Sequence, residues 1–202
     1  MKKRSFSIIF IVTLTLGLLS CVYLQTQQRQ LSKKLIRLHV VANSDSETDQ
    51  AIKLRVRDAV LFAAEPLLQS GKSAESALST QLGTLETAAV NALHALGRED
   101  AVSVTLQNER FPTRDYETFS LPAGVYRTLR VTIGEGQGHN WWCVVFPTLC
   151  TAASMEDLES AAVSGGFSDS EIKLITGADS GYVLKFKTLE WLEKLKSLLW
   201  GA

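Results

Sequence analysis

The sequence predicts an α+β fold: a single exported domain with a mainly antiparallel sheet packed against two long helices, preceded by an N-terminal membrane-spanning or signal helix. Three observations lead to this prediction. A long uncharged run follows Lys2, Lys3 and Arg4. Two later segments repeat apolar residues at steps of three and four, which is helical spacing. Shorter segments alternate apolar and polar residues and are rich in β-branched or aromatic types, as strands are. We expect a signal or anchor segment with its tether at residues 1–34 and one domain at residues 35–202.

The N-terminal segment is expected to direct export. The run Ser5–Gln28 carries no charge and is apolar at its centre, Ile8–Leu24, as in a signal or anchor helix. The basic residues before it should keep the N-terminus in the cytoplasm and send the rest of the chain outward. No pair of small residues suited to cleavage follows, which favours retention. Residues 18–21 resemble a lipobox that would lipidate Cys21; the favoured alternative is that Cys21 is an ordinary apolar position of an uncleaved helix.

The charge balance excludes one class of partner. Lysine plus arginine and aspartate plus glutamate number 21 each, so the formal net charge is zero. Domains that bind nucleic acid present a basic face, and no cluster of basic residues here exceeds what a solvated helix face would carry. We therefore expect no nucleic-acid partner.

The domain should open with a strand at Leu35–Val41 and continue into a helix. The four residues from Asn43 are polar types that cap helices, and acidic residues follow where the helix dipole favours negative charge. Pro66 should end or kink this helix. Its apolar stripe comprises Ile52, Val56, Ala59, Val60 and Ala63, and Lys53, Arg57 and Asp58 lie away from most of that stripe.

A second long helix is predicted from about Ser73 to Leu96, with Gly97 as its stop signal. The remaining elements are expected further along the chain: strands at Val102–Leu106, Gly124–Ile133 and Trp141–Phe146, a short helix at Met155–Val163, a late strand at Tyr182–Phe186 and an amphipathic C-terminal helix at Leu189–Trp200. Gly134, Gly136 and Gly138 lie between two predicted strands, which favours a hairpin loop over a phosphate-binding loop at a helix N-terminus.

Trp141 and Trp142 are the least generic feature of the chain. Adjacent residues of a strand point to opposite faces, so one indole would be core and the other a recognition surface, or each would pack under its own face of the sheet. Both alternatives stay open. We treat both tryptophans as candidates for partner contact.

Two cysteines beyond the N-terminal helix are candidates for a disulfide. Cys143 and Cys150 form an even pair in a segment expected outside the cytoplasm, where oxidation is permitted. A continuous strand would hold them too far apart, so the bond requires a chain reversal, for which Pro147 is the turn signal. The alternative is two buried free thiols.

Catalysis finds little support in the sequence. The chain has three histidines, His39, His94 and His139, and no two of them have metal-ligand or triad spacing. A dyad of Cys143 with His139 is the weakest option, because catalytic dyads usually come from distant segments. We expect no catalytic residues, no metal and no cofactor.

The polar corner at Asn43, Ser44 and Asp45 allows two interpretations. Asparagine, serine and aspartate are preferred helix caps, which favours a capping role. The other interpretation is that Asn43 and Asp45 contact a partner protein.

Two stretches resemble a known family. The first is Ile36–Ser46 (IRLHVVANSDS), with Asp49-Gln50, Lys53 and Val56–Val60 (VRDAV). The second runs from Phe111-Pro112-Thr113 through Pro122-Ala123-Gly124 to Asn140–Cys143 (NWWC) and Pro147–Cys150 (PTLC). Over about residues 35–150 the chain resembles the stage II sporulation protein R family. The ending, residues 182–200, is also similar to that of the family.

The resemblance implies a signal and not a catalyst. Proteins of this family are made in the forespore of endospore-forming bacteria and exported into the space between the two sporulation membranes. There they trigger a membrane-embedded aspartic protease of the mother cell, which processes the sigma-E precursor. The resemblance thus implies that protease as the partner, beside the membrane reached through the N-terminal helix. The alternative function is a membrane-anchored envelope module that binds peptidoglycan or a small ligand.

Overall fold

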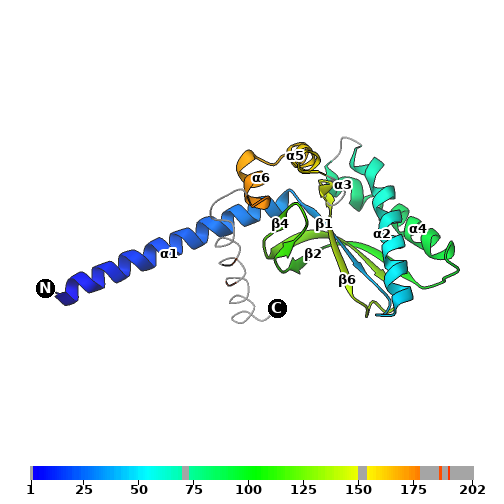
Figure 1. Cartoon of the computed structure of the whole chain (residues 1–202), viewed down its shortest axis with the longest axis horizontal. Coiled ribbons are helices and arrows are strands. Elements are labelled where there is room, and N and C mark those ends of the chain that lie inside the picture. Colours follow the sequence, from blue (N-terminus) through cyan, green and yellow to red (C-terminus); the bar gives the residue numbers. More distant parts are fainter. Residues whose placement is uncertain (1, 70–72, 150–153, 178–186, 188–190, 192–202) are drawn as a thin grey trace. The chain divides into compact units, whose positions relative to one another are not determined.

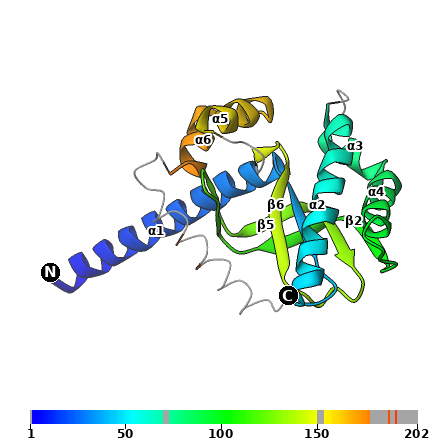
Figure 2. The same cartoon turned by 45° about the vertical axis from the view of Figure 1, so that its right-hand side comes forward.

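The computed structural model describes residues 2–69, 73–149, 154–177, 187 and 191. Figures 1 and 2 show its elements. Contacts divide the chain into two compact units, one built from Lys33–Glu109 and Val125–Ser168 and the other from Met1–Ser32, Arg110–Gly124 and Asp169–Ala202. In chain order the elements are α1 (Lys2–Lys33), β1 (Ile36–Val41), α2 (Glu47–Leu68), α3 (Ala74–Ser79), α4 (Leu82–His94), β2 (Val102–Phe111), β3 (Arg114–Asp115), β4 (Ser120–Leu121), β5 (Gly124–Ile133), β6 (Asn140–Phe146), α5 (Met155–Ser164) and α6 (Asp169–Ile175).

The main sheet is mixed: beside antiparallel pairing, as predicted, it contains a parallel pair of strands that the prediction did not include. Its strand order is β2-β5-β1-β6. β1 pairs in parallel with β5, with Leu38 opposite Leu129, and antiparallel with β6, with Leu38 opposite Cys143. Between β1 and β5 the chain passes through helices α2, α3 and α4, and such a crossover can return a strand parallel to the first. Strand periodicity does not reveal this direction.

The glycine-rich segment, residues 134–139, is not the hairpin loop that the sequence predicts. β5 and β6 are not neighbours, because β1 lies between them. The segment, called the glycine loop below, therefore crosses the end of β1, where that strand leads into α2. Adjacent strands are about 4.8 Å apart, so the loop spans roughly 10 Å. This crossing brings residues of the loop next to residues nearly a hundred positions earlier in the chain.

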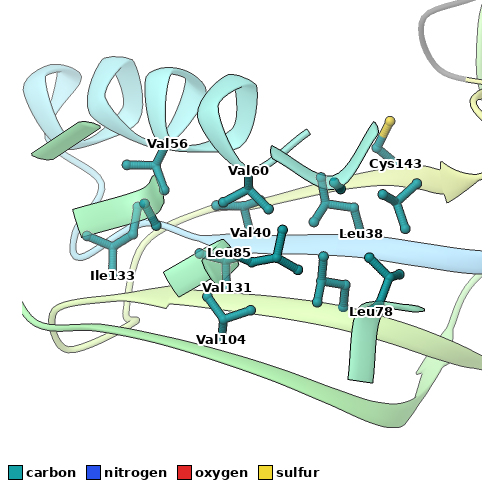
Figure 3. Close-up of a cluster of buried hydrophobic side chains, with 14 of the residues drawn as sticks. Leu38, Val40, Val56, Val60, Leu78, Leu85, Val104, Val131, Ile133 and Cys143 are labelled. Carbon is teal, nitrogen blue, oxygen red and sulfur yellow. The ribbon is translucent and has the colours of Figure 1, made fainter. Parts of the chain in front are cut away.

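Helices α2 and α4 cover one face of this sheet (Figures 1 and 2). Figure 3 shows side chains of α2, among them Val56 and Val60, gathered with Leu38 and Val40 of β1 and with Val131 of β5. The apolar stripe predicted for α2 is confirmed at its centre, since Ile52, Val56 and Val60 are buried. Pro66 does not stop the helix, which continues to Leu68.

The second long helix of the prediction is two helices, α3 and α4. The hydroxyls of Ser79 and Thr80 donate to the carbonyl of Ser76 over 3.1 and 2.9 Å, respectively. Hydroxyl groups that bond to nearby carbonyls compete with helix continuation, and α4 begins anew at Leu82. The predicted stop is confirmed: Gly97 has a φ of 69°, and Arg98 N–H donates to the carbonyl of Leu93.

The other unit contains α1, the short β3–β4 pair and α6. In the β3–β4 pair Asp115 is opposite Ser120, whose hydroxyl donates to the Asp115 carboxylate over 2.6 Å. Among the described residues, no helix combines the length and apolar character that crossing a membrane requires. The anchor or signal role of residues 1–34 and the lipidation of Cys21 stay predictions. The strand expected at Tyr182–Phe186 and most of the helix expected at Leu189–Trp200 lie outside the described residues.

Cys143 lies on β6 with 3% of its surface exposed, and Figure 3 shows it at the edge of the core cluster. It is disulfide-bonded. Cys150 lies outside the described residues, so its pairing with Cys143 stays a prediction.

Alkylation of the purified, unfolded full chain without reduction is expected to leave both Cys143 and Cys150 unlabelled. Prior reduction should expose both to the label, and mass spectrometry reads the result. A bond closing so short a loop would contribute at most about 2 to 3 kcal/mol. Label on both cysteines in the unreduced sample would show that the pairing is wrong.

Candidate functional site

The candidate site is built on the turn between β1 and α2, here called the corner (residues 42–50). Ser46 is the N-cap of α2, and its hydroxyl accepts from Asp49 N–H over 3.1 Å. Ser46 is therefore the residue that caps this helix. Asn43, Ser44 and Asp45, for which capping was the favoured interpretation, make other contacts.

Asp49 is the buried centre of the corner, with 6% of its surface exposed. One carboxylate oxygen accepts from the Ser44 hydroxyl over 2.6 Å and from the Asn43 amide over 2.9 Å. The other oxygen accepts from the guanidinium of Arg98 over 3.1 Å. The hydrogen bonds from Ser44 and Asn43, with the charge of Arg98, hold the pKa of Asp49 below its ordinary value. Asp49 thus ties the corner to the segment that follows α4.

The glycine loop is bonded to this corner along its length. Gln137 N–H donates to the carbonyl of Asn43 over 3.1 Å, and Gly138 N–H donates to the carbonyl of Ala42 over 2.9 Å. The side-chain oxygen of Asn43 accepts from Glu135 N–H over 3.0 Å. Asn43 therefore links the corner to the loop. Its amide nitrogen donates a hydrogen bond within the corner, and its amide oxygen accepts one from the loop.

Two glycines of the loop are required by this close approach. Gly134 has a φ of 56°, and a Cβ there would lie 2.7 Å from Cγ of Asn43. A Cβ on Gly138 would lie 2.6 Å from the carbonyl carbon of Ser44 and closer still to its oxygen. At Gly138 the obstacle is backbone, which cannot swing aside as a flexible side chain can, and at Gly134 the positive φ disfavours any residue with a side chain. The loop therefore contacts the corner only because side chains are missing at these positions.

Asp45 and His139 form an exposed pair where corner and loop meet. The Asp45 carboxylate accepts from the His139 backbone N–H over 2.6 Å and also from the ring Nδ1–H. These hydrogen bonds hold the pKa of Asp45 below its ordinary value. The side chains are 56% and 78% exposed, respectively. Both groups are thus available to a partner.

Lys53 is buried beneath the pair, although the sequence placed it away from the apolar stripe. It is 5% exposed, and its ammonium donates to the carbonyl of His139 over 2.9 Å and to the Gln50 side chain. Burial lowers the pKa of Lys53. The spacing in the sequence did indicate this burial. Lys53 precedes buried Val56 and Val60 by three and seven residues and so lies on the same face of the helix.

The two tryptophans lie on opposite faces of the sheet, as their adjacency requires. The ring of Trp141 stacks on the guanidinium of Arg57, 4.4 Å from the ring centroid, and Trp141 is 36% exposed. Trp142 is half-buried on the other face, its ring centroid 5.8 Å from that of His39. Neither indole is fully buried, so each packs partly under its own face.

His39 forms a second polar group on the face opposite the helices. Its Nδ1 lies 2.7 Å from the carboxylate of Glu109 on β2, and its Nε2 lies 2.8 Å from the side-chain oxygen of Asn140 on β6. Arg130 on β5 donates to the same carboxylate over 3.1 Å. This group was not predicted from the sequence, because its members come from four strands whose order the sequence does not reveal.

Reactive side chains are not assembled into a recognisable catalytic set at this site. Cys143 is buried and disulfide-bonded, so its sulfur is not a free thiolate, while His139 is exposed and paired with Asp45. Within the part of the chain that the structure describes, no group of three or more histidine, cysteine, aspartate or glutamate side chains could hold a metal ion. The arrangement is suited to presenting an exposed aromatic and charged surface on a rigid support.

Comparisons with known proteins agree with the motifs of the corner and of β6. A family model described as stage II sporulation protein R (spore_II_R) matches residues 32–156. The stage II sporulation protein R of Bacillus subtilis (strain 168) is 29% identical over 229 residues, and the alignment covers 98% of this chain and 100% of that protein. No solved structure matches the chain. The matched segment contains the corner, the glycine loop and both tryptophans.

Proposed function

Because the chain belongs to the stage II sporulation protein R family, we propose that it is an exported signal of sporulation. In this proposal it activates a membrane-embedded aspartic protease that processes the mother-cell sigma-E precursor. The family match over residues 32–156 carries the proposal. The basic N-terminus and the apolar run after it support export from the forespore to the intermembrane space, with the N-terminal helix in the membrane.

The contact surface for the protease is proposed to be Asp45, Arg57, His139 and Trp141. Tryptophan and arginine are enriched among the residues that dominate protein–protein binding energy. Trp141 and Arg57 are already stacked on each other, so less side-chain freedom is lost on binding. Asp45 on the corner and His139 on the glycine loop add exposed polar groups to this surface. His139 lies two residues before Trp141 in the chain.

The two other predicted contact residues support this surface but are not part of it. Asn43 is occupied by Asp49 and Glu135, and Trp142 packs beside His39 on the opposite face. We therefore assign them to supporting the surface, whereas Asp45 and Trp141 would touch the protease directly.

The proposal is tested by co-expressing the full chain with the protease and the sigma-factor precursor in a non-sporulating host. Precursor cleavage, read by gel mobility, is expected only when all three proteins are present. A catalytically inactive protease provides the matched control. Absence of cleavage with three stably expressed, correctly located proteins would contradict the proposed function.

Within this assay, Trp141→Ala is expected to reduce precursor cleavage at least about tenfold, because it removes the anchor of the contact surface. Phe62→Ala is the matched control, since Phe62 is an aromatic residue on α2 that is 80% exposed and lies outside the contact surface. The control should process precursor at the wild-type level. Wild-type cleavage by Trp141→Ala would exclude Trp141 from the contact.

A further inference from the structure

His39 is a buried histidine with an oxygen atom at each ring nitrogen. It lies in the central strand β1 with 7% of its surface exposed. Nδ1 is 2.7 Å from Glu109 Oε2, and Nε2 is 2.8 Å from Asn140 Oδ1. The first partner is a carboxylate and the second is an amide oxygen, and both are acceptors.

The carboxylate partner is held in its charged form. Burial alone would raise the pKa of Glu109, but hydrogen bonds from His39, Gln107 and Arg130 outweigh it, so the pKa lies below its ordinary value. Gln107 donates over 2.7 Å and Arg130 over 3.1 Å to the oxygen that His39 does not use. Glu109 therefore accepts from Nδ1–H of His39 whether or not the ring carries a second proton.

The bond at Nε2, in contrast, depends on the charge of the ring. A neutral imidazole has one N–H and one lone pair, whereas the protonated ring has an N–H at each nitrogen. With Nδ1–H donated to Glu109, only the protonated ring can also donate to the side-chain oxygen of Asn140. The neutral ring would present a lone pair to that oxygen, so this bond would be broken unless the Asn140 amide turned its NH2 group toward the ring.

Asn140 connects this chemistry to the contact surface. It is the first residue of β6, stands opposite Val41, and lies directly between His139 and Trp141. We propose that His39 is a positioning residue for the segment 139–141: its protonated form holds Asn140 in place, and loss of one proton releases that hold. The effect on signalling rests on the proposed function, but the hydrogen bond between His39 and Asn140 does not.

The charged groups around His39 come from neighbouring strands of the sheet. Glu109 from β2 carries a negative charge and Arg130 from β5 a positive one, while Asn140 and Trp142 from β6 are uncharged. On β1 itself, Arg37 is buried and stacks on Tyr126, 5.1 Å from the ring centroid. The bond to Asn140 is present while both ring nitrogens of His39 carry a proton, and it is lost when Nε2 gives up its proton.

The test is an NMR titration of the purified full chain, whose three histidines give few ring signals. The hydrogen-exchange protection factors of residues 139–141, corrected for intrinsic exchange, are expected to fall about tenfold as His39 loses its proton. In Asn140→Asp a second carboxylate faces the ring, so both the His39 midpoint and the fall in protection should move up by about one pH unit. In Glu109→Gln both should move down.

His139→Gln is the control, because it removes the histidine inside the segment itself and should leave the His39 midpoint in place. Protection that stays constant through the His39 titration, or a midpoint that Asn140→Asp does not raise, would overturn the proposal. A merely structural role of His39 would let the midpoint shift in these variants without moving the fall in protection along with it.

The consequence for the partner is measured with the protease in lipid vesicles. Binding of the full chain should weaken about fivefold above the His39 midpoint, and Asn140→Asp should keep its affinity to higher pH. Binding that does not change with pH would show that the protonation of His39 does not affect the contact surface. If no binding occurs at any pH, the proposed function fails instead, and the NMR titration still decides the role of His39.

Discussion

Replacing Asp49 with alanine is expected to lower the free energy of unfolding by about 3 kcal/mol, because the donors that converge on its carboxylate lose their acceptor inside the fold. Ser44, Asn43 and Arg98 all donate to it. The corner would then no longer be tied to the segment after α4. Urea unfolding of the full chain measures the change.

Two companion variants sharpen this prediction. Asn43 and Ser44 donate to the same oxygen of Asp49, so the single carbonyl oxygen of Asp49→Asn could keep both bonds. That variant should lose less than half as much stability. Asp58→Ala, on the same helix but 55% exposed at its side chain, should change stability by no more than about 0.5 kcal/mol. Equal effects of Asp49→Ala and Asp58→Ala would contradict the central role of Asp49.

The effect of Asp49→Ala should also depend on pH. The folded pKa of Asp49 is depressed, so the contribution of its charge is present above the unfolded value of about 4 and is lost as the pH falls through the folded value. The stability difference between the wild type and Asp49→Ala should therefore narrow in acid.

Gly138→Ala is expected to cost about 2 to 3 kcal/mol and to reduce precursor cleavage strongly. The new methyl group would lie 2.6 Å from the carbonyl carbon of Ser44 and 2.9 Å from Cβ of Ala42. Overpacking against backbone can be relieved only by moving the loop away from the corner. That movement would break the bond from Gly138 N–H to Ala42 and displace His139, and with it part of the contact surface.

Gly83→Ala is the matched control for this substitution. Gly83 lies in α4, and a Cβ there would meet nothing within 4 Å. Alanine in a helix is favoured over glycine by roughly 0.5 to 1 kcal/mol, so this variant should be more stable than the wild type and fully active. Thermal unfolding and the co-expression assay measure both variants. A Gly138→Ala chain as stable as the wild type would show that the loop does not need this close approach.

Elements with a strong local pattern were predictable. Alternation in residues 35–41 identifies β1, and the apolar stripe at Ile52, Val56 and Val60 identifies α2. The stop at Gly97 followed from its conformational freedom. In contrast, the break between α3 and α4 depends on hydroxyl groups at Ser79 and Thr80 that bond within one turn. Serine and threonine are tolerated in many uninterrupted helices, so their presence did not predict a break.

Some residues of the candidate site were singled out from the sequence, but their partners were not. Asn43, Asp45 and Trp141 were singled out by residue type, yet capping was the favoured role for the first two. The sequence does not show that Asp45 pairs with His139, because the two are 94 residues apart. Lys53 was misplaced because a charged residue is ordinarily assigned to the solvated side of a helix. Its buried ammonium is bonded to the carbonyl of His139 and to the Gln50 side chain.

By itself the sequence determined the fold class, the family and the segments that carry its motifs, because helical and strand periods, caps and glycine stops depend on neighbours a few residues apart. Only the tertiary structure decided that β1 lies between β5 and β6. That order makes the glycine loop cross the end of β1, and it brings His39 to Asn140 across 101 residues. Strand order is set by contacts between distant segments that all bury the same apolar face, and no local pattern records which of these contacts forms.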